Sequence, residues 1–216
     1  MLKAQIVPVT ALAQNCSIVW CDETMEGAII DLGGDVDRVL AKAAELGVKV
    51  TKLLLTHGHL DHAGGAAEGR ERLGVQVIGP HREDSFWLDQ IETHAAEYRL
   101  PGLRNVTPDQ WLEGGDRVSF GNITLEVRFT PGHTPGHIIF FEPESKVAFV
   151  GDDLFKGSMG RTDFPRGDFD TLIRSITTQL WPLGDDVTFV PGHGPLSTFG
   201  EERKTNPFVA DKVLAG

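Results

Sequence analysis

Short apolar runs and helical spacings of apolar residues divide this chain into strands and helices. Runs bounded by glycine, proline or asparagine predict β-strands, which we expect over residues 5–9, 16–21, 28–31, 48–56, 75–78, 117–120, 123–129, 137–141, 146–150 and 187–190. Helical spacing predicts helices, which we expect over residues 35–46, 66–73, 82–98, 169–180, 200–204 and 207–214. Asp35 is expected to cap the first helix, and Gly47 stands at its stop position.

The order of these elements predicts an α/β fold in which two similar halves each pair a mixed sheet with flanking helices. Because each sheet must bury an apolar face, helices outside and sheets inside is the arrangement that fits. The sequence contains no internal linker, repeat or low-complexity tract, so we expect one domain over residues 1–216.

Charge and cysteine content narrow the function classes. The formal net charge is −11, which argues against a protein that grips nucleic-acid phosphates, and no run approaches the ~20 apolar residues of a membrane span. Cys16 and Cys21 lie five positions apart in a predicted strand and therefore on opposite faces. We expect two free thiols and a cytoplasmic protein; Pro8 interrupts the faint resemblance of the N-terminus to a signal peptide.

Residues 57–62 carry the strongest chemical signal, His-Gly-His-Leu-Asp-His, directly after an apolar run. His57 and His59 are two positions apart, so on an extended backbone they point the same way. Asp61 and His62 follow after the chain turns. Such crowded ionisable groups would repel or desolvate one another without a cation. One loop that offers ligands in two directions indicates two metal ions.

Three later strand ends repeat this arrangement of an apolar strand, a glycine turn and a potential ligand. They end at His133, Asp152 and His193. We expect His57, His59 and His133 to form an all-nitrogen site, and Asp61, His62 and His193 to form a second site. Asp152, with two carboxylate oxygens, can bridge both. The predicted cofactors are two divalent metal ions, zinc first, with iron or manganese as alternatives for such mixed nitrogen and oxygen ligands.

These motifs, together with Pro-Gly-His-Thr-Pro-Gly-His over residues 131–137, resemble those of the metallo-β-lactamase superfamily. Within it the chain is most similar to glyoxalase II-type hydrolases, which cleave S-lactoylglutathione. Residues 154–164 and 192–198 are similar to a short bacterial glyoxalase II-like subgroup that consists of the metal domain alone. The resemblance implies a four-layer αβ/βα sandwich and a dinuclear site formed by the seven residues above. His137 follows the motif ligand and is expected to be a strand residue or a partner of the ligands.

The activity implied is thioester hydrolysis by a metal-bound hydroxide, on a small-molecule thioester and without a nucleic-acid or membrane partner. Asp61 is the expected catalytic residue, because it can ligate the second ion and orient the hydroxide. Arg161 is the candidate for holding a substrate carboxylate, with pairing to Asp163 or Asp168 as the alternative. Lys156 is a further candidate of the same kind.

Three other functions remain open at this point. Persulfide dioxygenases resemble the chain in Gly-Arg-Thr-Asp-Phe, residues 160–164, and use one iron at the first site. Hydrolysis of a β-lactam or a phosphodiester is the second alternative. A non-catalytic role is the third; it predicts damaged ligand positions, whereas all seven carry side chains able to bind metal.

Overall fold

Two mixed β-sheets form the centre of the computed structural model, which describes residues 1–215. The first sheet has the strand order β1-β2-β3-β4-β5. Its first three strands pair antiparallel, and β3, β4 and β5 pair parallel. The strands are β1 (Leu2–Val9), β2 (Gln14–Cys21), β3 (Glu26–Ile30), β4 (Lys49–Leu54) and β5 (Gln76–Ile78).

The second sheet has the order β13-β12-β9-β8-β7-β6, with β12 and β9 parallel and the other pairs antiparallel. A separate hairpin of β10 and β11 follows β9. The strands are β6 (Arg117–Phe120), β7 (Ile123–Phe129), β8 (Ile138–Glu142), β9 (Val147–Gly151), β10 (Leu154–Phe155), β11 (Ser158–Met159), β12 (Thr188–Pro191) and β13 (Ser197–Thr198).

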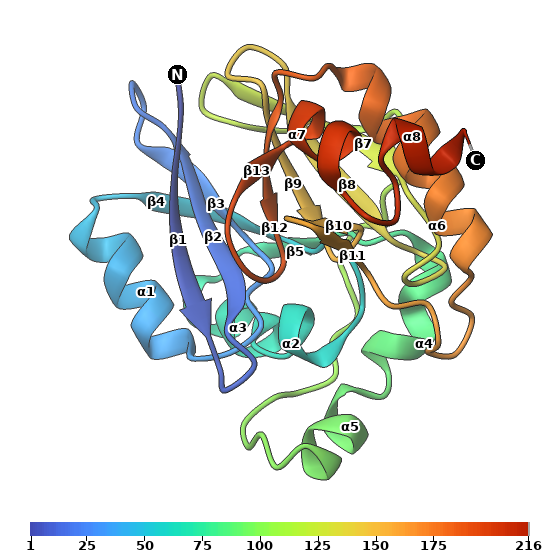
Figure 1. Cartoon of the computed structure of the whole chain (residues 1–216). Helices are drawn as coiled ribbons and strands as arrows, with labels where there is room; N and C mark the ends of the chain where they lie inside the picture. Colours follow the sequence, from blue (N-terminus) through green and yellow to red (C-terminus); the bar gives the residue numbers. More distant parts are fainter. Residues whose placement is uncertain (216) are drawn as a thin grey trace.

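Helices cover the outer faces of both sheets. Figure 1 shows α1 and α3 on the outer side of the first sheet and α6 to α8 beyond the second. The helices are α1 (Val36–Glu45), α2 (Leu60–Ala63), α3 (Ala66–Leu73), α4 (Ser85–Leu88), α5 (Ile91–Glu97), α6 (Phe169–Ser175), α7 (Phe199–Thr205) and α8 (Asp211–Leu214), with single turns η1 (Arg82–Asp84), η2 (Ile176–Leu180) and η3 (Trp181–Leu183). The predicted layering of helix, sheet, sheet and helix is thus confirmed. Within residues 1–215 no helix has both the length and the apolar composition to cross a bilayer.

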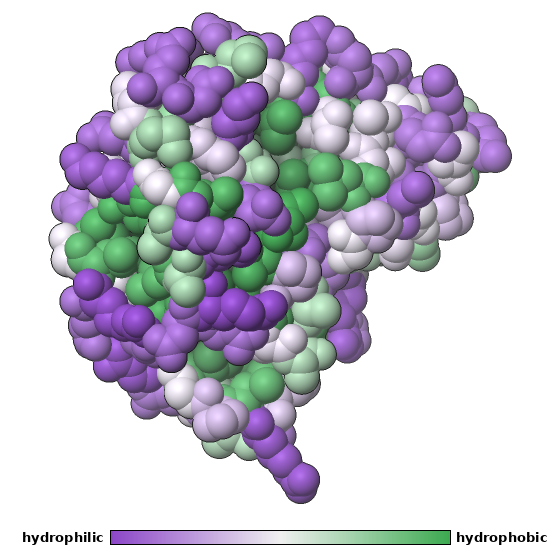
Figure 2. Space-filling model, turned by 90° about the vertical axis from the view of Figure 1, so that its left-hand side faces the viewer, coloured by the Kyte–Doolittle hydropathy of each residue, from purple (hydrophilic) through white to green (hydrophobic). Residues whose placement is uncertain are grey.

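Alternate residues of the central strands build separate hydrophobic layers, as the two-residue period of a strand requires. Ile30 of the first sheet and Phe140 of the second lie in the central layer between the sheets. Their neighbours Ile29 and Ile139 belong to the outer layers under the helices. Cys16 and Cys21 follow the same rule and are buried free thiols in different layers. On the side that carries α1 and β4, Figure 2 shows hydrophobic patches enclosed by hydrophilic side chains.

The single helix predicted over residues 82–98 is wrong, because the segment divides into η1, α4 and α5. The side chain of Asn105 holds the junction open. Its amide nitrogen donates to the carbonyl of Asp89 at 2.8 Å, and its oxygen accepts from the amide of Glu92 at 2.9 Å. These bonds satisfy backbone groups that a continuous helix would have used.

Asp35 occupies the N-cap position of α1 but makes no capping hydrogen bond, contrary to expectation. Its carboxylate instead accepts from the amide of Thr10 at 2.9 Å and pairs with Arg38 at 2.8 Å. The β10–β11 hairpin and β13 were not predicted, since strands of two residues leave no readable periodicity.

Phe140 tests the packing between the sheets. It is fully buried, and its strand neighbours in register are Val127 and Phe149. Phe140→Ala should lower the free energy of unfolding by about 3–5 kcal/mol, from lost apolar burial and the cavity left behind. Phe169→Ala, at a side chain that is 50% exposed, is the control and should cost about 1 kcal/mol or less. Urea unfolding of the metal-free protein measures both, and equal losses would contradict the assigned core.

Candidate metal centre

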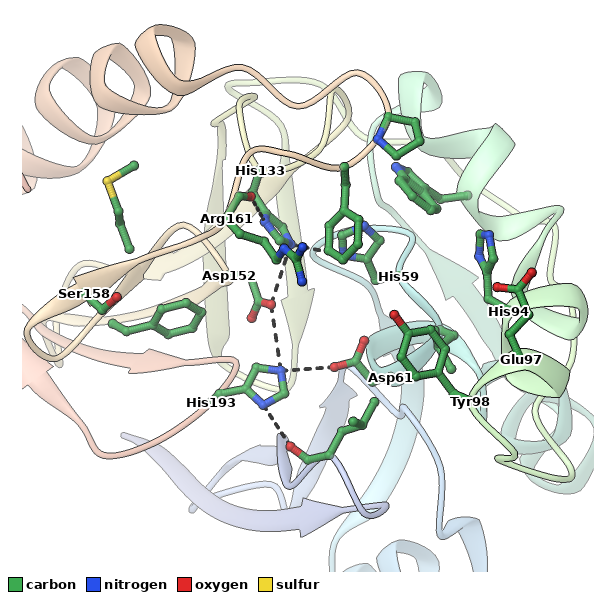
Figure 3. Close-up of a pocket in the computed structure, with 17 residues that line it drawn as sticks. His59, Asp61, His94, Glu97, Tyr98, His133, Asp152, Ser158, Arg161 and His193 are labelled. Atoms are coloured by element: carbon green, nitrogen blue, oxygen red, sulfur yellow. Dashed lines mark hydrogen bonds and ion pairs between the residues drawn. The ribbon is translucent and has the colours of Figure 1, made fainter.

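The four segments that carry the expected metal ligands meet at one edge of the two sheets. Residues 57–62 follow β4, His133 follows β7, and Asp152 and His193 follow the parallel neighbours β9 and β12. Figure 3 shows His59, Asp61, His133, Asp152 and His193 pointing into one shared space. Strand ends are rigid platforms, so the side chains are aimed by the sheets rather than by flexible loops.

Three imidazoles form the first cluster, which brings together His57, His59 and His133 as the strand-end pattern predicted. Nδ1 of His59 lies 3.2 Å from Nε2 of His57 and 3.0 Å from Nε2 of His133. All three side chains are buried. The nitrogens thus lie close to the separation of about 3.3 Å expected between ligands of a tetrahedral zinc ion with Zn–N bonds of about 2.0 Å.

Hydrogen bonds fix which nitrogen of each ring carries the proton. The hydroxyl of Thr56 donates to Asp31 at 2.6 Å, so its oxygen is left to accept from Nδ1–H of His57 at 3.0 Å. Nδ1–H of His133 donates to the carbonyl of Arg161 at 2.7 Å. In both rings the lone pair is therefore on Nε2, the atom that faces the cluster.

Asp61, His62 and His193 form the second cluster. The Oδ2 atom of Asp61 lies 3.0 Å from Nε2 of His193 and 3.7 Å from Nε2 of His62. Their Nδ1 protons are again taken up elsewhere: that of His62 by Asp31 at 2.8 Å and that of His193 by the carbonyl of Leu12 at 3.1 Å. Both Nε2 atoms therefore face the cluster.

Asp152 lies between the two clusters, where the bridging residue was expected. Its Oδ1 is 3.3 Å from Nε2 of His62, and its Oδ2 is 3.6 Å from Nε2 of His133 and 3.8 Å from Nε2 of His193. The backbone amide of Asp152 donates to Nε2 of His137 at 3.2 Å. His137 thus supports Asp152 through its backbone.

Burial and neighbouring charge shift the histidine pKa values of the two clusters in opposite directions. Burial lowers the pKa of His57 and His59 well below the usual value, and neighbouring imidazoles lower it further. Burial also lowers the pKa of His62, but the carboxylates of Asp152, Asp61 and Asp31 outweigh it and hold that pKa well above its usual value. Burial opposes ionisation of Asp152 as well, yet His62 keeps its pKa low. The pKa values of His57 and His59 in the first cluster are thus lowered, whereas that of His62 in the second is raised.

Polar atoms left without partners show that this donor set fits cations. Nε2 of His62 and Oδ1 of Asp152 are buried and have no hydrogen-bond partner among the described residues. The Nε2 lone pairs of His57 and His133 also converge on Nδ1 of His59 at the first cluster. Unpartnered buried polar groups are costly, and a divalent cation bound by nitrogen and carboxylate ligands satisfies them.

A cavity of about 610 Å³ opens above the clusters. Apart from the ligands, its wall is mostly apolar and aromatic; it comprises Leu12, Leu60, Trp87, Tyr98, Phe155, Met159, Phe164 and Pro165, with His94, Glu97, Ser158 and Arg161 as polar members. The indole of Trp87 packs edge-on against His59 with ring centroids 4.5 Å apart. The volume and lining are typical of a small-molecule site.

The two predicted substrate-binding residues have different positions. Arg161 lines the cavity, but its Nε and Nη2 atoms each lie 2.6 Å from a carboxylate oxygen of Asp163, and its guanidinium stacks over Phe164 at 4.1 Å. The alternative pairing with Asp163 is therefore present in this structure. Lys156 is exposed in the turn of the β10–β11 hairpin and is not part of the cavity wall. Substrate binding by either residue stays a prediction.

Asp31 is the main site residue that the sequence analysis missed. It lies one residue beyond β3 and holds Thr56 and His62 through its buried carboxylate. The signal was present, because Asp31 also ends an apolar strand and precedes a glycine turn. Trp87 and Phe164 gave no comparable signal, since isolated aromatic residues are indistinguishable from ordinary core residues by sequence alone.

Removing a ligand should separate metal binding from pocket shape. His59→Ala or Asp152→Ala should lower the bound metal and reduce affinity by more than about 100-fold, which exceeds the usual effect of changing a residue behind the ligands. His94→Ala is the matched control, because His94 lines the same cavity without joining either cluster. Metal quantification after dialysis checks the result, and full metal content in both ligand variants would refute the assigned site.

Comparison with known proteins agrees with this geometry. The family model described as "Metallo-beta-lactamase superfamily" matches residues 9–193. The chain is 45% identical to a protein of Haemophilus influenzae named hydroxyacylglutathione hydrolase GloC, over 98% of this chain and 100% of that one.

Two solved structures show the same fold over most of their length. The BLEG-1 B3 metallo-beta-lactamase has a TM-score of 0.87 and 31% identity, with 97% of this chain and 99% of that chain covered. TTHA1623, described in a di-iron-bound form, has a TM-score of 0.86 and 35% identity, with 94% and 99% covered. The chain therefore belongs to the metallo-beta-lactamase superfamily and is a metallo-hydrolase.

Proposed function

We propose that this metallo-hydrolase hydrolyses thioesters of the hydroxyacylglutathione type with two divalent metal ions. The observation that carries the proposal is the pair of ligand clusters joined by Asp152 at the floor of one cavity. The likeness to the hydroxyacylglutathione hydrolase of H. influenzae over the whole chain supports the substrate class.

Seven residues would hold the ions: His57, His59 and His133 the first, Asp61, His62 and His193 the second, and Asp152 both. When bound, such ions polarise a carbonyl oxygen and lower the pKa of water toward neutrality. We propose zinc, with iron and manganese as alternatives that the same ligand types accept. The di-iron form of TTHA1623 keeps iron in consideration.

Asp61 is the catalytic residue of the proposal. Its carboxylate lines the cavity, and its Oδ2 lies 3.0 Å from Nε2 of His193. Burial raises the pKa of this carboxyl, but His62 and His193 more than offset the effect and leave it below the usual value. An ionised carboxylate at the cavity floor can accept a hydrogen bond from the attacking water and orient it toward the substrate carbonyl.

The chemistry of a thioester and the apolar wall of the cavity both suit this reaction. Water adds to the carbonyl carbon, the carbon–sulfur bond breaks, and the products are a carboxylic acid and a thiol. A thiol has a pKa of about 8.5, so the sulfur can leave without a strong protein acid. The apolar residues Trp87, Phe155 and Phe164 exclude bulk water from the acyl group and strengthen polar interactions at the floor.

We also propose a cytoplasmic location and a single domain over residues 1–216. The two cysteines are free and buried, which suits a reducing compartment. The two sheets share one central apolar layer, which supports their folding as one unit.

The alternative functions gain less support. A persulfide dioxygenase with one iron would need only the first cluster, whereas the second is assembled with its lone pairs inward. The likeness to the BLEG-1 metallo-beta-lactamase makes β-lactam hydrolysis the second candidate. The chain is less similar to that lactamase, at 31% identity, than to the hydroxyacylglutathione hydrolase of H. influenzae, at 45%.

The proposal is tested by metal quantification of protein from its native host, followed by a substrate panel on the same sample. We expect two ions per chain and hydrolysis of S-lactoylglutathione-type thioesters, both lost with a chelator and regained with zinc. One iron per chain with persulfide-dependent oxygen uptake, or faster turnover of a β-lactam or phosphodiester, would overturn it.

Arg161 and Asp163 should act in opposite directions on anionic substrates. Arg161→Ala should raise KM for a glutathione thioester about tenfold, the usual effect of losing a charged hydrogen bond, and leave a neutral N-acetylcysteamine thioester nearly unchanged. Asp163→Asn removes the competing carboxylate and should lower KM for the glutathione thioester a few-fold. Steady-state kinetics of both variants on both substrates is the measurement, and equal effects on the two thioesters would remove Arg161 from substrate recognition.

A further inference from the structure

Asp84 has a buried carboxylate that no part of the proposed reaction uses. It is fully buried, and it stands at the N-cap position of α4 without making a capping hydrogen bond. A buried carboxylate is costly unless its oxygens are well satisfied. The partners that satisfy Asp84 therefore indicate why this position carries a charge.

All three hydrogen bonds to this carboxylate come from the two loops that carry the first cluster. The amide of Gly58, between His57 and His59, donates to Oδ2 at 2.8 Å. The hydroxyl of Thr134, next to His133, donates to the same oxygen at 2.7 Å. The amide of Gly136 donates to Oδ1 at 2.6 Å.

The backbone around Asp84 fits against the same two loops so closely that both need glycine. A Cβ atom on Gly58 would lie 2.7 Å from Cβ of Trp87 and 2.9 Å from the carbonyl oxygen of Asp84. A Cβ atom on Gly136 would lie 2.7 Å from Oδ1 of Asp84 and 2.7 Å from the carbonyl oxygen of His81. The amide of His81 in turn donates to the carbonyl of Gly136 at 3.1 Å.

We infer that Asp84 is a positioning residue that sets the separation of His57 and His59 from His133, and so the metal affinity of the first cluster. Its carboxylate ties together two loops that come from different sheets. Without it, the loop after β4 and the loop before β8 lose a shared acceptor and the three nitrogens lose their spacing. This inference rests on the two-ion site proposed above.

Two variants that each keep one intact ligand cluster test the inference. His193→Ala leaves the first cluster intact, and His57→Ala leaves the second cluster intact. Adding Asp84→Asn should lower zinc affinity about tenfold in the first background and leave it nearly unchanged in the second, as measured by competition with a chromophoric chelator. A loss of general stability would affect both backgrounds, so equal losses, or no loss, would overturn the inference.

Thr134→Val and Glu202→Gln are the matched variants. Thr134→Val removes one of the three donors and should give a smaller loss at the first cluster. Glu202 is also a buried carboxylate, and it accepts from Gly157 and Asn206, each at 2.8 Å, and from Ser197. Its change to glutamine should cost comparable stability without affecting zinc affinity at the first cluster.

Amide exchange gives a readout that needs no metal. In the metal-free protein, Asp84→Asn should speed exchange of the Gly58 and Gly136 amide protons about tenfold or more relative to the other slow amides. Unchanged protection at both glycines would overturn the inference. If the His193→Ala protein bound no zinc, the proposed first site would fail, while the exchange data would still decide whether Asp84 ties the loops.

Discussion

The buried carboxylate of Asp31 is the interaction on which both ligand clusters depend. Its Oδ2 accepts from Nδ1–H of His62 in the second cluster and from the hydroxyl of Thr56, whose oxygen accepts from His57 in the first. Its Oδ1 accepts from the amide of Thr56 at 2.8 Å. One acceptor therefore fixes the tautomer of one ligand in each cluster, and a ring held in the other tautomer would present a proton where a lone pair is required.

The two ligand clusters differ in the charge of the side chains that form them. The first cluster is built from imidazoles whose pKa values are lowered by burial, which favours the neutral rings with a lone pair on one nitrogen. The second combines Asp61 and Asp152 with His62, whose pKa the carboxylates raise against the effect of burial. Because histidine binds metal in its deprotonated form, the raised pKa of His62 would oppose binding at the second cluster, whereas the lowered pKa of His57 would favour binding at the first. Two ions at the proposed site would therefore meet different costs of deprotonating their ligands.

The main strands and the residues of the two clusters could be predicted from the sequence. Strands that are buried on both faces leave long apolar runs, and the expected ligands follow these runs directly. The ligand set needed only the recognition that four strand ends share one pattern. The division of residues 82–98 into three short helices could not be predicted. It depends on Asn105, whose contacts with Asp89 and Glu92 form only in the folded chain. The pairing of Arg161 with Asp163 was one of two readings that spacing left open, and geometry was needed to choose between them.

Each cluster takes ligands from both halves of the fold, and this couples metal binding to the packing of the sheets. The segment after β4 supplies His57 and His59 to the first cluster and Asp61 and His62 to the second, while His133 and His193 come from loops of the other sheet. A cation bound at either cluster would therefore link the two halves across their shared edge. Because a ligand stabilises the state that binds it, the ions would strengthen the packing of the sheets as well as supply the chemistry. The shared edge, rather than either sheet alone, is thus the structural origin of the site.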